Sequence, residues 1–324
     1  VPATGVLTVA PVATTSYALY CSDSEEADFA QTLVLVLPSA APWTEESPMA
    51  SPGARSGHAM AFDGEKIILF GGDDGALQND TWSWDGATWV SESPMTSPPA
   101  RAGHAMARTS GGVLLFGGED GSGPRNDTWL WDGDDWTQLS PANVPPARAA
   151  HAMARDGGSI VLFGGEGSGG LLGDTWRWDG NNWNALPGPS PSARADAQLS
   201  YDVQSGDLQL LGGRTASAVL GDRWTLTPLG WRLSSIVPTI RLADAAVASD
   251  GIQVLLVGGD YGQGLSDATL LGASGTYRAI PDTIAAPGAR QGAAAAYDSV
   301  LDELVLFGGD SGTADLGDTW TWVP

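Results

Sequence analysis

Residues 55–89 read RSGHAMAFDGEKIILFGGDDGALQNDTWSWDGATW, and the order of motifs in this segment predicts the fold. It starts with an Arg-x-x-His motif, continues with the apolar run Ile67–Phe70 and stops at Gly71-Gly72. An Asp-Thr-Trp-x-Trp motif follows at Asp80, and a further tryptophan stands at Trp89. Short apolar runs that end at glycine pairs are typical of β-strands joined by turns. The stretch therefore predicts several short strands and no helix.

The same order of motifs recurs along the chain at a nearly fixed period. The copies begin at Arg55, Arg101, Arg148, Arg194, Arg241 and Arg290, with steps of 46, 47, 46, 47 and 49 residues. Residues 1–49 carry a weaker copy, in which the segment from Trp43 to Met49 aligns with the segment from Trp89 to Met95. A period of about 40–50 residues matches one four-stranded blade of a β-propeller. The sequence thus predicts an all-β repeat protein.

Acidic residues dominate the charge of the chain. The 324 residues include 38 acidic and 15 basic side chains, which give a net charge of -23. Such a charge repels nucleic-acid phosphates and anionic headgroups, so we expect no nucleic-acid partner. The longest apolar runs, such as Leu33–Leu37, are far shorter than the roughly 20 residues of a transmembrane helix, so we expect no membrane insertion. The single cysteine, Cys21, excludes an internal disulfide framework and a cysteine-based metal cluster.

Taken together, the Arg-x-x-His, Gly-Gly and Asp-Thr-Trp-x-Trp motifs resemble the kelch repeat. The resemblance covers the whole chain, most clearly residues 50–185. It implies an all-β, kelch-type β-propeller in which each repeat supplies four strands, a to d, that run outward from a central channel. We expect a single propeller domain of seven blades, residues 1–324, whose first blade is degenerate. The expected repeats are 1–49 (degenerate), 50–95, 96–142, 143–189, 190–236, 237–284 and 285–324.

Six blades closed by an N-terminal strand are the alternative, because the last repeat stops before its fourth strand. In that case either Gly5–Ala10 or the segment at Trp43 supplies the missing strand, and the rest of the first repeat is a remnant.

The repeated arginines are the main candidates for ligand binding. The resemblance places the b–c loops and the d–a loops on one face, at the channel mouth, where kelch proteins usually bind their ligands. In kelch domains that recognise acidic peptides, arginines at this position contact ligand carboxylates, and a guanidinium suits that task because it binds a carboxylate bidentately. The expected ligand-binding residues are Arg55, Arg101, Arg148, Arg194, Arg241 and Arg290.

A network within the protein is the competing interpretation for these arginines, because a desolvated guanidinium needs a partner when no ligand is bound. An acidic residue follows Gly-Gly in five repeats and lies on the same expected face. These residues are Asp73, Glu119, Glu166, Asp260 and Asp310.

Histidines and tryptophans also occupy fixed repeat positions. His58, His104 and His151 are equivalent, and we expect each to bond to the backbone of its own blade, with a shared zinc site as the alternative. The fourteen tryptophans fall on three repeat positions, two on strand c and one on strand d, so we expect them to pack between blades.

Six aspartates begin strand c and are expected to close the b–c loops through Asx-type hydrogen bonds. They are Asp80, Asp127, Asp174, Asp222, Asp267 and Asp318. Calcium is the alternative, because Asp73-Asp74-Gly and Glu119-Asp120-Gly are rich in oxygen ligands. Neither segment has the dense ligand spacing of a calcium-binding loop. We therefore expect no metal and no cofactor, with calcium as the one cofactor that these loops could accept.

The function predicted from these features is non-catalytic binding of a protein segment or a glycan, including acidic ones, on the b–c loop face at the central channel. No Gly-x-Ser-x-Gly elbow, His-Glu-x-x-His motif or phosphate loop is present, so no catalytic residue is assigned. The alternative is a small-molecule enzyme that resembles sialic acid mutarotase and acts on an anionic sugar, with Asp74, Asp120 or Glu166 as the acid or base.

Assembly and location are expectations from composition. We expect a monomer. Scarce lysine and abundant alanine are typical of exported proteins from high-GC bacteria, and Val1 in place of methionine fits a chain whose signal has been removed. The expected location is extracellular, periplasmic or on the cell surface.

Overall fold

The computed structural model describes residues 15–22, 27–34, 43–202, 205–234, 241–250, 253–262, 264–267, 269–273, 276–279 and 286–323. These residues form strands and turns, and none of them is helical, which confirms the all-β prediction. Accordingly, no apolar helix of membrane-spanning length occurs in the described ranges. The chain divides into two compact units, Val1–Ala41 and Pro42–Pro324.

The described part of the smaller unit is a two-stranded antiparallel sheet. Strands β1 (Thr15–Ser22) and β2 (Ala27–Val34) pair along their whole length, from Thr15 opposite Val34 to Ser22 opposite Ala27. In the described part of the chain, neither strand pairs with any other.

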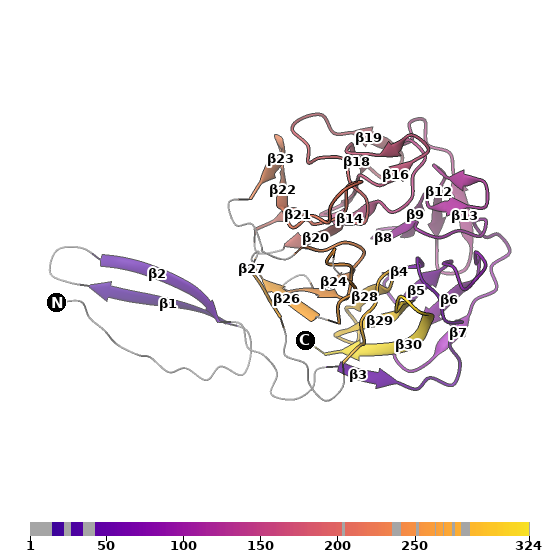
Figure 1. The fold of residues 1–324 in the computed structure, drawn as a ribbon, viewed down its shortest axis with the longest axis horizontal. Helices are drawn as coiled ribbons and strands as arrows, with labels where there is room; N and C mark the ends of the chain where they lie inside the picture. The colour runs from indigo at the N-terminus through magenta and orange to yellow at the C-terminus, as the bar shows by residue number, and fades with distance from the viewer. Residues whose placement is uncertain are drawn as a thin grey trace. The chain divides into compact units, whose positions relative to one another are not determined.

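The larger unit contains, within its described residues, six four-stranded antiparallel sheets, which are the blades of a β-propeller (Figure 1). We number the sheets 1 to 6 by the chain order of their innermost strands, strand a. These strands are β4 (Ala59–Phe62), β8 (Ala105–Thr109), β14 (Ala152–Asp156), β20 (Gln198–Asp202), β24 (Ala246–Ser249) and β28 (Ala294–Asp298).

The remaining strands of sheets 1 to 6 follow outward in the same order. Strand b is β5 (Ile67–Phe70), β9 (Gly112–Phe116), β15 (Ser159–Phe163), β21 (Asp207–Leu211), β25 (Val254–Val257) and β29 (Glu303–Asp310). Strand c is β6 (Thr81–Trp84), β12 (Thr128–Trp131), β18 (Thr175–Trp178), β22 (Arg223–Thr227), β26 (Thr269–Ala273) and β30 (Asp315–Trp322). Strand d is β7 (Trp89–Ser91), β13 (Trp136–Leu139), β19 (Trp183–Ala185), β23 (Gly230–Leu233), β27 (Thr276–Ala279) and, in sheet 6, β3 (Trp43–Glu46). Two b–c loops carry small hairpins, β10 (Glu119–Asp120) with β11 (Gly123–Pro124) and β16 (Glu166–Gly167) with β17 (Gly170–Leu171).

The inner strands form a closed ring around the channel. Each strand a contacts strand a of the next sheet, and β28 of sheet 6 contacts β4 of sheet 1 (Figure 1). The sheet that bridges the two ends of the larger unit is sheet 6, in which β3 pairs with β30 from Trp43 opposite Trp322 to Glu46 opposite Thr319.

This closure corrects the expectation of a seventh, degenerate blade built from residues 1–49. Because β28 contacts β4 directly, no further sheet fits between sheets 6 and 1. The described residues of the expected blade go elsewhere, since β1 and β2 form their own sheet and β3 belongs to sheet 6. The candidate closing strand Gly5–Ala10 lies outside the described residues.

The core lies between the sheets, because strand b is buried on both of its faces. In β5, Ile67 and Leu69 pack toward sheet 6, whereas Ile68 and Phe70 pack toward sheet 2. The whole strand is at most 1% exposed. A strand that is covered on both faces needs apolar side chains at every position. This is why an unbroken apolar run precedes each Gly-Gly.

Tryptophans of strand d join neighbouring sheets, as predicted. The indole Nε1 of Trp136 in sheet 2 donates to the hydroxyl of Thr81 in sheet 1, at 3.0 Å, and Trp183 and Trp231 make the same bond to the preceding sheet. In sheet 1, Trp89 donates to Thr319 of sheet 6. The bond therefore crosses the boundary where the chain closes on itself.

Candidate functional site

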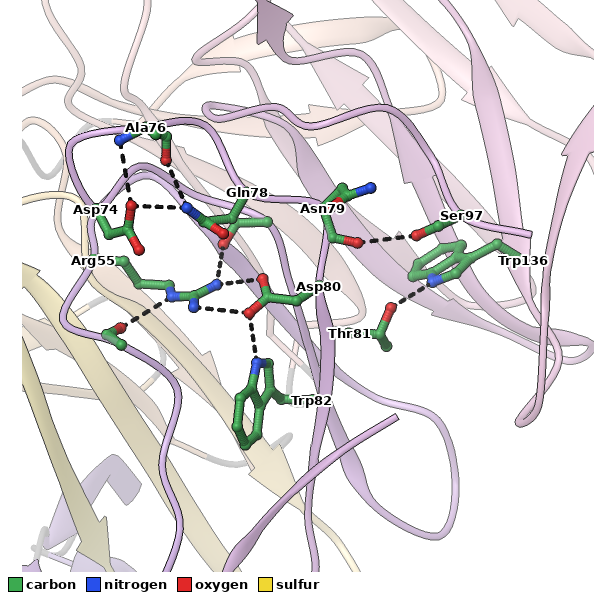
Figure 2. Close-up of polar contacts among 12 residues, drawn as sticks. Arg55, Asp74, Ala76, Gln78, Asn79, Asp80, Thr81, Trp82, Ser97 and Trp136 are labelled. Atoms are coloured by element: carbon green, nitrogen blue, oxygen red, sulfur yellow. Dashed lines mark hydrogen bonds and ion pairs between the residues drawn. The ribbon is translucent and has the colours of Figure 1, made fainter. Parts of the chain in front are cut away.

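Five of the six candidate arginines form one repeated ion-pair motif inside their own sheets. In sheet 1, Arg55 Nη1 and Nη2 donate to the two carboxylate oxygens of Asp80 at 2.6 and 2.9 Å (Figure 2). Arg55 also donates to the carbonyl oxygens of Gly53 and Gly71, and Asp80 accepts a further bond from Trp82 Nε1. The motif therefore ties together the d–a loop, the end of strand b and the start of strand c. The equivalent pairs are Arg101–Asp127, Arg148–Asp174, Arg194–Asp222 and Arg290–Asp318.

Burial removes these five guanidinium groups from the channel surface. Their exposed fractions range from 0 to 2%. The structure thus bears out a network within the protein, but the partners are the strand-c aspartates and not the expected acidic residues that follow Gly-Gly. Direct contact of these arginines with a ligand stays a prediction that would require the ion pairs to open. Arg241 differs, because it is exposed and forms no such pair with Asp267 within the described residues.

The same contacts change the role expected for the strand-c aspartates. They were expected to close the b–c loops by local Asx-type bonds, and instead they accept from arginine and tryptophan side chains. Partial burial opposes ionisation of Asp127, but the hydrogen bond and the charge of Arg101 outweigh burial and lower its pKa. The pKa values of Asp80, Asp174, Asp222 and Asp318 are lowered by equivalent partners.

The three histidines pack against the neighbouring sheet. The rings of His58, His104 and His151 lie edge-to-face, with centroids 5.5 Å away, on phenylalanines at the end of strand b in the preceding sheet. Among the described residues, none of the ring nitrogens has a partner of standard hydrogen-bond geometry, so the expected bond within each histidine's own sheet is wrong. Burial and the nearby arginine lower the pKa of His58 and of His151 to about 3. The imidazoles are therefore neutral at pH 7.

The oxygen-rich b–c loops use their carboxylates to close turns. Asp74 accepts from the backbone of Ala76 and from Gln78 Nε2 (Figure 2), and Asp120 accepts from Ser122 and Arg125. No group of three or more His, Cys, Asp or Glu side chains in the described ranges is arranged to hold a metal ion. Calcium binding stays a prediction, which a thermal shift reversed by a chelator would test.

A closed ring of six backbone hydrogen bonds surrounds the channel on the face of the b–c loops. Each ring residue lies two positions before strand a, and its N–H donates to the carbonyl of the equivalent residue in the preceding sheet at 2.8–3.2 Å. The ring residues are Gly57, Gly103, Ala150, Asp196, Asp244 and Gly292. All six have φ between 55° and 65°, a region that favours glycine. The ring thus explains the glycine in the Arg-x-Gly motif.

Two of the ring residues are aspartates, and one of them pairs with an arginine that also departs from the repeat. Arg214 occupies the position after Gly-Gly that is acidic in the other five sheets, and its guanidinium pairs with Asp196 and, at 3.3 Å, with Glu166. A backbone bridge between Ala195 and Arg214 holds Arg214 beside the ring. Asp244 follows Asp196 in the ring and is bonded to it through the backbone. Aspartate tolerates a positive φ better than most residues, so the ring can hold these two carboxylates at a modest cost.

The two ring carboxyls have raised pKa values. Burial, together with the charge of Asp196, raises the pKa of Asp244 to about 7. Burial also raises the pKa of Asp196, although Arg214 opposes that shift. This part of the ring can therefore exchange a proton near neutral pH.

The ring opens into a cavity of about 460 Å³ at the channel mouth. We call the carboxylates that line it the acidic mouth. The acidic mouth consists of Asp73, Glu119, Asp196, Asp244 and Asp310. The lining residues, all of which are described, include no lysine, arginine, tryptophan or tyrosine. Asp196 is already paired with Arg214, and Asp244 is partly protonated near pH 7. The mouth therefore presents backbone groups and the negative charge of Asp73, Glu119 and Asp310 to a ligand.

Sequence reasoning missed Asp196, Arg214 and Asp244, although a signal was present. Each of them replaces the residue type that most other repeats carry at the same position. Departures from a repeat are candidates for function, because the repeat itself records what the fold requires.

The chain matches a known family of repeat domains. A family model described as the KLHDC2/KLHL20/DRC7 Kelch-repeats domain matches residues 20–176 and residues 96–259. The two overlapping matches together span residues 20–259, which is well over half of the chain. No curated protein matches the chain.

Proposed function

Because the chain belongs to the kelch-repeat family, we propose that its propeller is a non-catalytic binding module whose acidic mouth engages a positively charged segment of a partner protein. Kelch propellers in general serve as protein-interaction modules. The observation that carries the proposal is the set of five carboxyl groups around the 460 Å³ cavity, with no lysine or arginine among the lining residues.

Charge determines which ligand the mouth favours. An acidic ligand was expected because the repeated arginines were placed on the channel surface, and five of them are instead buried and paired. A carboxylate-lined concave site on a protein of net charge -23 attracts a lysine or arginine side chain and repels an anion. A glycan is less favoured, because no tryptophan or tyrosine lines the mouth as a stacking surface.

The test compares peptides of the same length with net positive, zero and negative charge in a fluorescence anisotropy titration. We expect binding of the positive peptide only, with an affinity that falls as salt is added, because exposed charges are screened over about 10 Å at 0.1 M salt. The double variant Asp73→Asn with Asp310→Asn removes two charges from the acidic mouth. Asparagine Oδ1 can still accept the turn bonds from Gly75 and Gly312. We expect this variant to bind roughly tenfold more weakly, which corresponds to about 1.4 kcal/mol.

A matched control removes the same two charges from the opposite face. Glu65 and Asp134 are exposed in an a–b turn and a c–d turn. The double variant Glu65→Gln with Asp134→Asn should bind the positive peptide as the unchanged protein does. Equal weakening in the two double variants would mean that net charge, and not the acidic mouth, attracts the peptide.

Catalysis on an anionic sugar is a second candidate, and the carboxyl of Asp244 is the observation that favours it. A carboxyl with a pKa near 7 can act as an acid or a base at neutral pH, and Arg214 lies close by on Asp196. Arg214 already forms ion pairs with Asp196 and Glu166, so it is poorly suited to bind the carboxylate of a sugar. Accelerated exchange of sialic acid anomers in NMR, lost on Asp244→Asn, would support the enzyme. Exchange at the uncatalysed rate would reject it.

A further inference from the structure

The other end of the channel has a different chemistry from the acidic mouth. It opens on the face of the a–b turns into a cavity of about 490 Å³. A floor of apolar side chains separates this cavity from the acidic mouth and lines both cavities. The floor residues are Met106, Met153, Leu199 and Val247. The volume is in the range of small-molecule sites in proteins, about 300–1,000 Å³.

The rim of this second cavity is set by one repeat position, four residues after the histidine position in strand a. Sheets 2 and 3 carry Arg108 and Arg155 there, and sheets 4, 5 and 6 carry Tyr201, Ser249 and Tyr297. Because the inner strands follow one another around the ring, the two arginines are neighbours on β8 and β14. Across the channel from them lie Ser249 on β24 and Tyr297 on β28. We call these five residues the arginine–tyrosine rim.

Neither rim arginine has a carboxylate partner among the described residues. The guanidinium carbon of Arg108 lies 5.1 Å from the ring centroid of Phe62, and Arg155 Nε donates to the carbonyl of Gly157 at 2.7 Å. Eight other arginines of the described ranges form ion pairs with Asp or Glu. In a chain with 38 acidic residues, two arginines on adjacent strands that line a cavity and have no carboxylate partner among the described residues are available for an anion from outside.

The acidic groups near the rim are already bonded. The carboxylate of Asp250, which also lines the cavity, accepts from the backbone of Gln253 at 2.6 Å. Asp156 pairs with Arg177, and Asp302 accepts from the hydroxyl of Tyr297. Asp250 and Asp302 keep their negative charge, because the Gln253 amide and the Tyr297 hydroxyl are neutral donors. The positive charge that the rim offers to a ligand is therefore on the side of β8 and β14, away from these two carboxylates.

We propose that the a–b-turn end of the channel binds a small organic carboxylate with an aromatic or aliphatic body. The carboxylate lies between Arg108 and Arg155, which can hold it through charge-assisted hydrogen bonds. The body packs on the floor methionines, whose flexible side chains adapt to different shapes, and against Tyr201. A bare anion would leave the apolar floor uncovered, and a neutral body would leave the arginines unpaired. The site therefore selects molecules that have both parts.

The test is a calorimetric or ligand-observed NMR titration of the whole chain with phenylacetate, phenylacetamide and acetate. We expect phenylacetate to bind at least about tenfold more tightly than either of the other two compounds. Arg108→Gln and Arg155→Gln should each weaken phenylacetate binding about tenfold, and the double variant should abolish it. Unchanged circular dichroism and thermal midpoints would show that the variants are folded.

Controls separate a built site from bulk charge and from the acidic mouth. Arg232→Gln removes an exposed charge from the outer strand β23 and should leave phenylacetate binding unchanged. The double variant Asp73→Asn with Asp310→Asn should also bind phenylacetate normally, so this inference and the proposed peptide site can fail separately. Equal binding of phenylacetamide, no binding of phenylacetate, or equal loss in Arg232→Gln would each overturn the proposal.

Discussion

At the residue scale, the ring aspartates show that a backbone position with a restricted φ can also carry an ionisable side chain. The backbone of ring residue 244 has a φ of 56°, and most repeats place glycine or alanine at this position. Aspartate there adds a partly buried carboxyl beside a second one at Asp196. The sequence marked these residues only as departures from a pattern. Their closeness follows from the ring hydrogen bonds, which no local motif encodes.

The raised pKa of Asp244 predicts a pH-dependent gain of stability in Asp244→Asn. Below about pH 4 the carboxyl is protonated in the folded and the unfolded chain, so it costs nothing. As the pH rises from about 4 to the folded pKa of about 7, the unfolded chain releases this proton and the folded protein still holds it, so stability is lost. Asparagine avoids this loss. We expect the gain in free energy of unfolding of the variant to be about 1–2 kcal/mol larger at pH 8 than at pH 4.5, measured by urea denaturation.

Asp244→Glu is the matched control, because it keeps a carboxyl at the same ring position. Its stability should decline between the two pH values as that of the unchanged protein does. A gain for Asp244→Asn that is the same at both pH values would show that burial of the charge is not the cause.

At the scale of the element, the buried arginine is a clamp between three segments of one sheet. Arg101 bonds to the carbonyl of Pro99 in the d–a loop, to that of Gly117 after strand b, and to Asp127 before strand c. The strands themselves were predictable, because their apolar runs and glycine stops are local signals. The partner of each arginine was not, because it lies 25 to 28 residues further along the chain and faces the guanidinium only once strands a, b and c pair.

Removing one partner of this clamp should destabilise the whole propeller. Asp127→Ala leaves the guanidinium of Arg101, which is 0% exposed, without its carboxylate. Breaking a buried ion pair in this way typically costs about 3–5 kcal/mol. We expect a loss of that size in the free energy of unfolding, and almost none for Asp134→Ala in the exposed c–d turn of the same sheet. Comparable denaturation midpoints for the two variants would contradict the role of the clamp.

At the scale of the whole molecule, the propeller is closed by a strand from the other end of the chain. β3 supplies the outer strand of sheet 6, and the ring of inner strands closes where β28 meets β4. Trp43 is 3% exposed and stacks edge-to-face on Trp322 with ring centroids 5.3 Å apart. A ring in which every sheet packs on two neighbours has no free end, so the closing strand stabilises all six described sheets together.

Trp43→Ala should therefore weaken the propeller as a unit. Truncation of a buried tryptophan typically costs about 3–5 kcal/mol, through lost burial and the cavity that it leaves. Guanidinium denaturation should show one cooperative transition at a lower midpoint, since the sheets share their cores. Thr44→Ala, an exposed change on the same strand, should leave the midpoint nearly unchanged. A separate early transition confined to part of the tryptophan fluorescence would indicate that the closure stabilises sheet 6 alone.

The strands, the glycine turns, the kelch family and the interleaved tryptophans were predictable from the sequence, because each of these follows from local chain geometry repeated at a fixed period. The tertiary structure was needed to show that five of the repeated arginines are buried clamps, that β3 closes the ring, and that the channel has an acidic mouth and an arginine–tyrosine rim at its two ends. These features depend on which residues of different sheets face one another. The physical reason is that burial and charge pairing are set across the closed ring, between residues separated by tens to hundreds of positions.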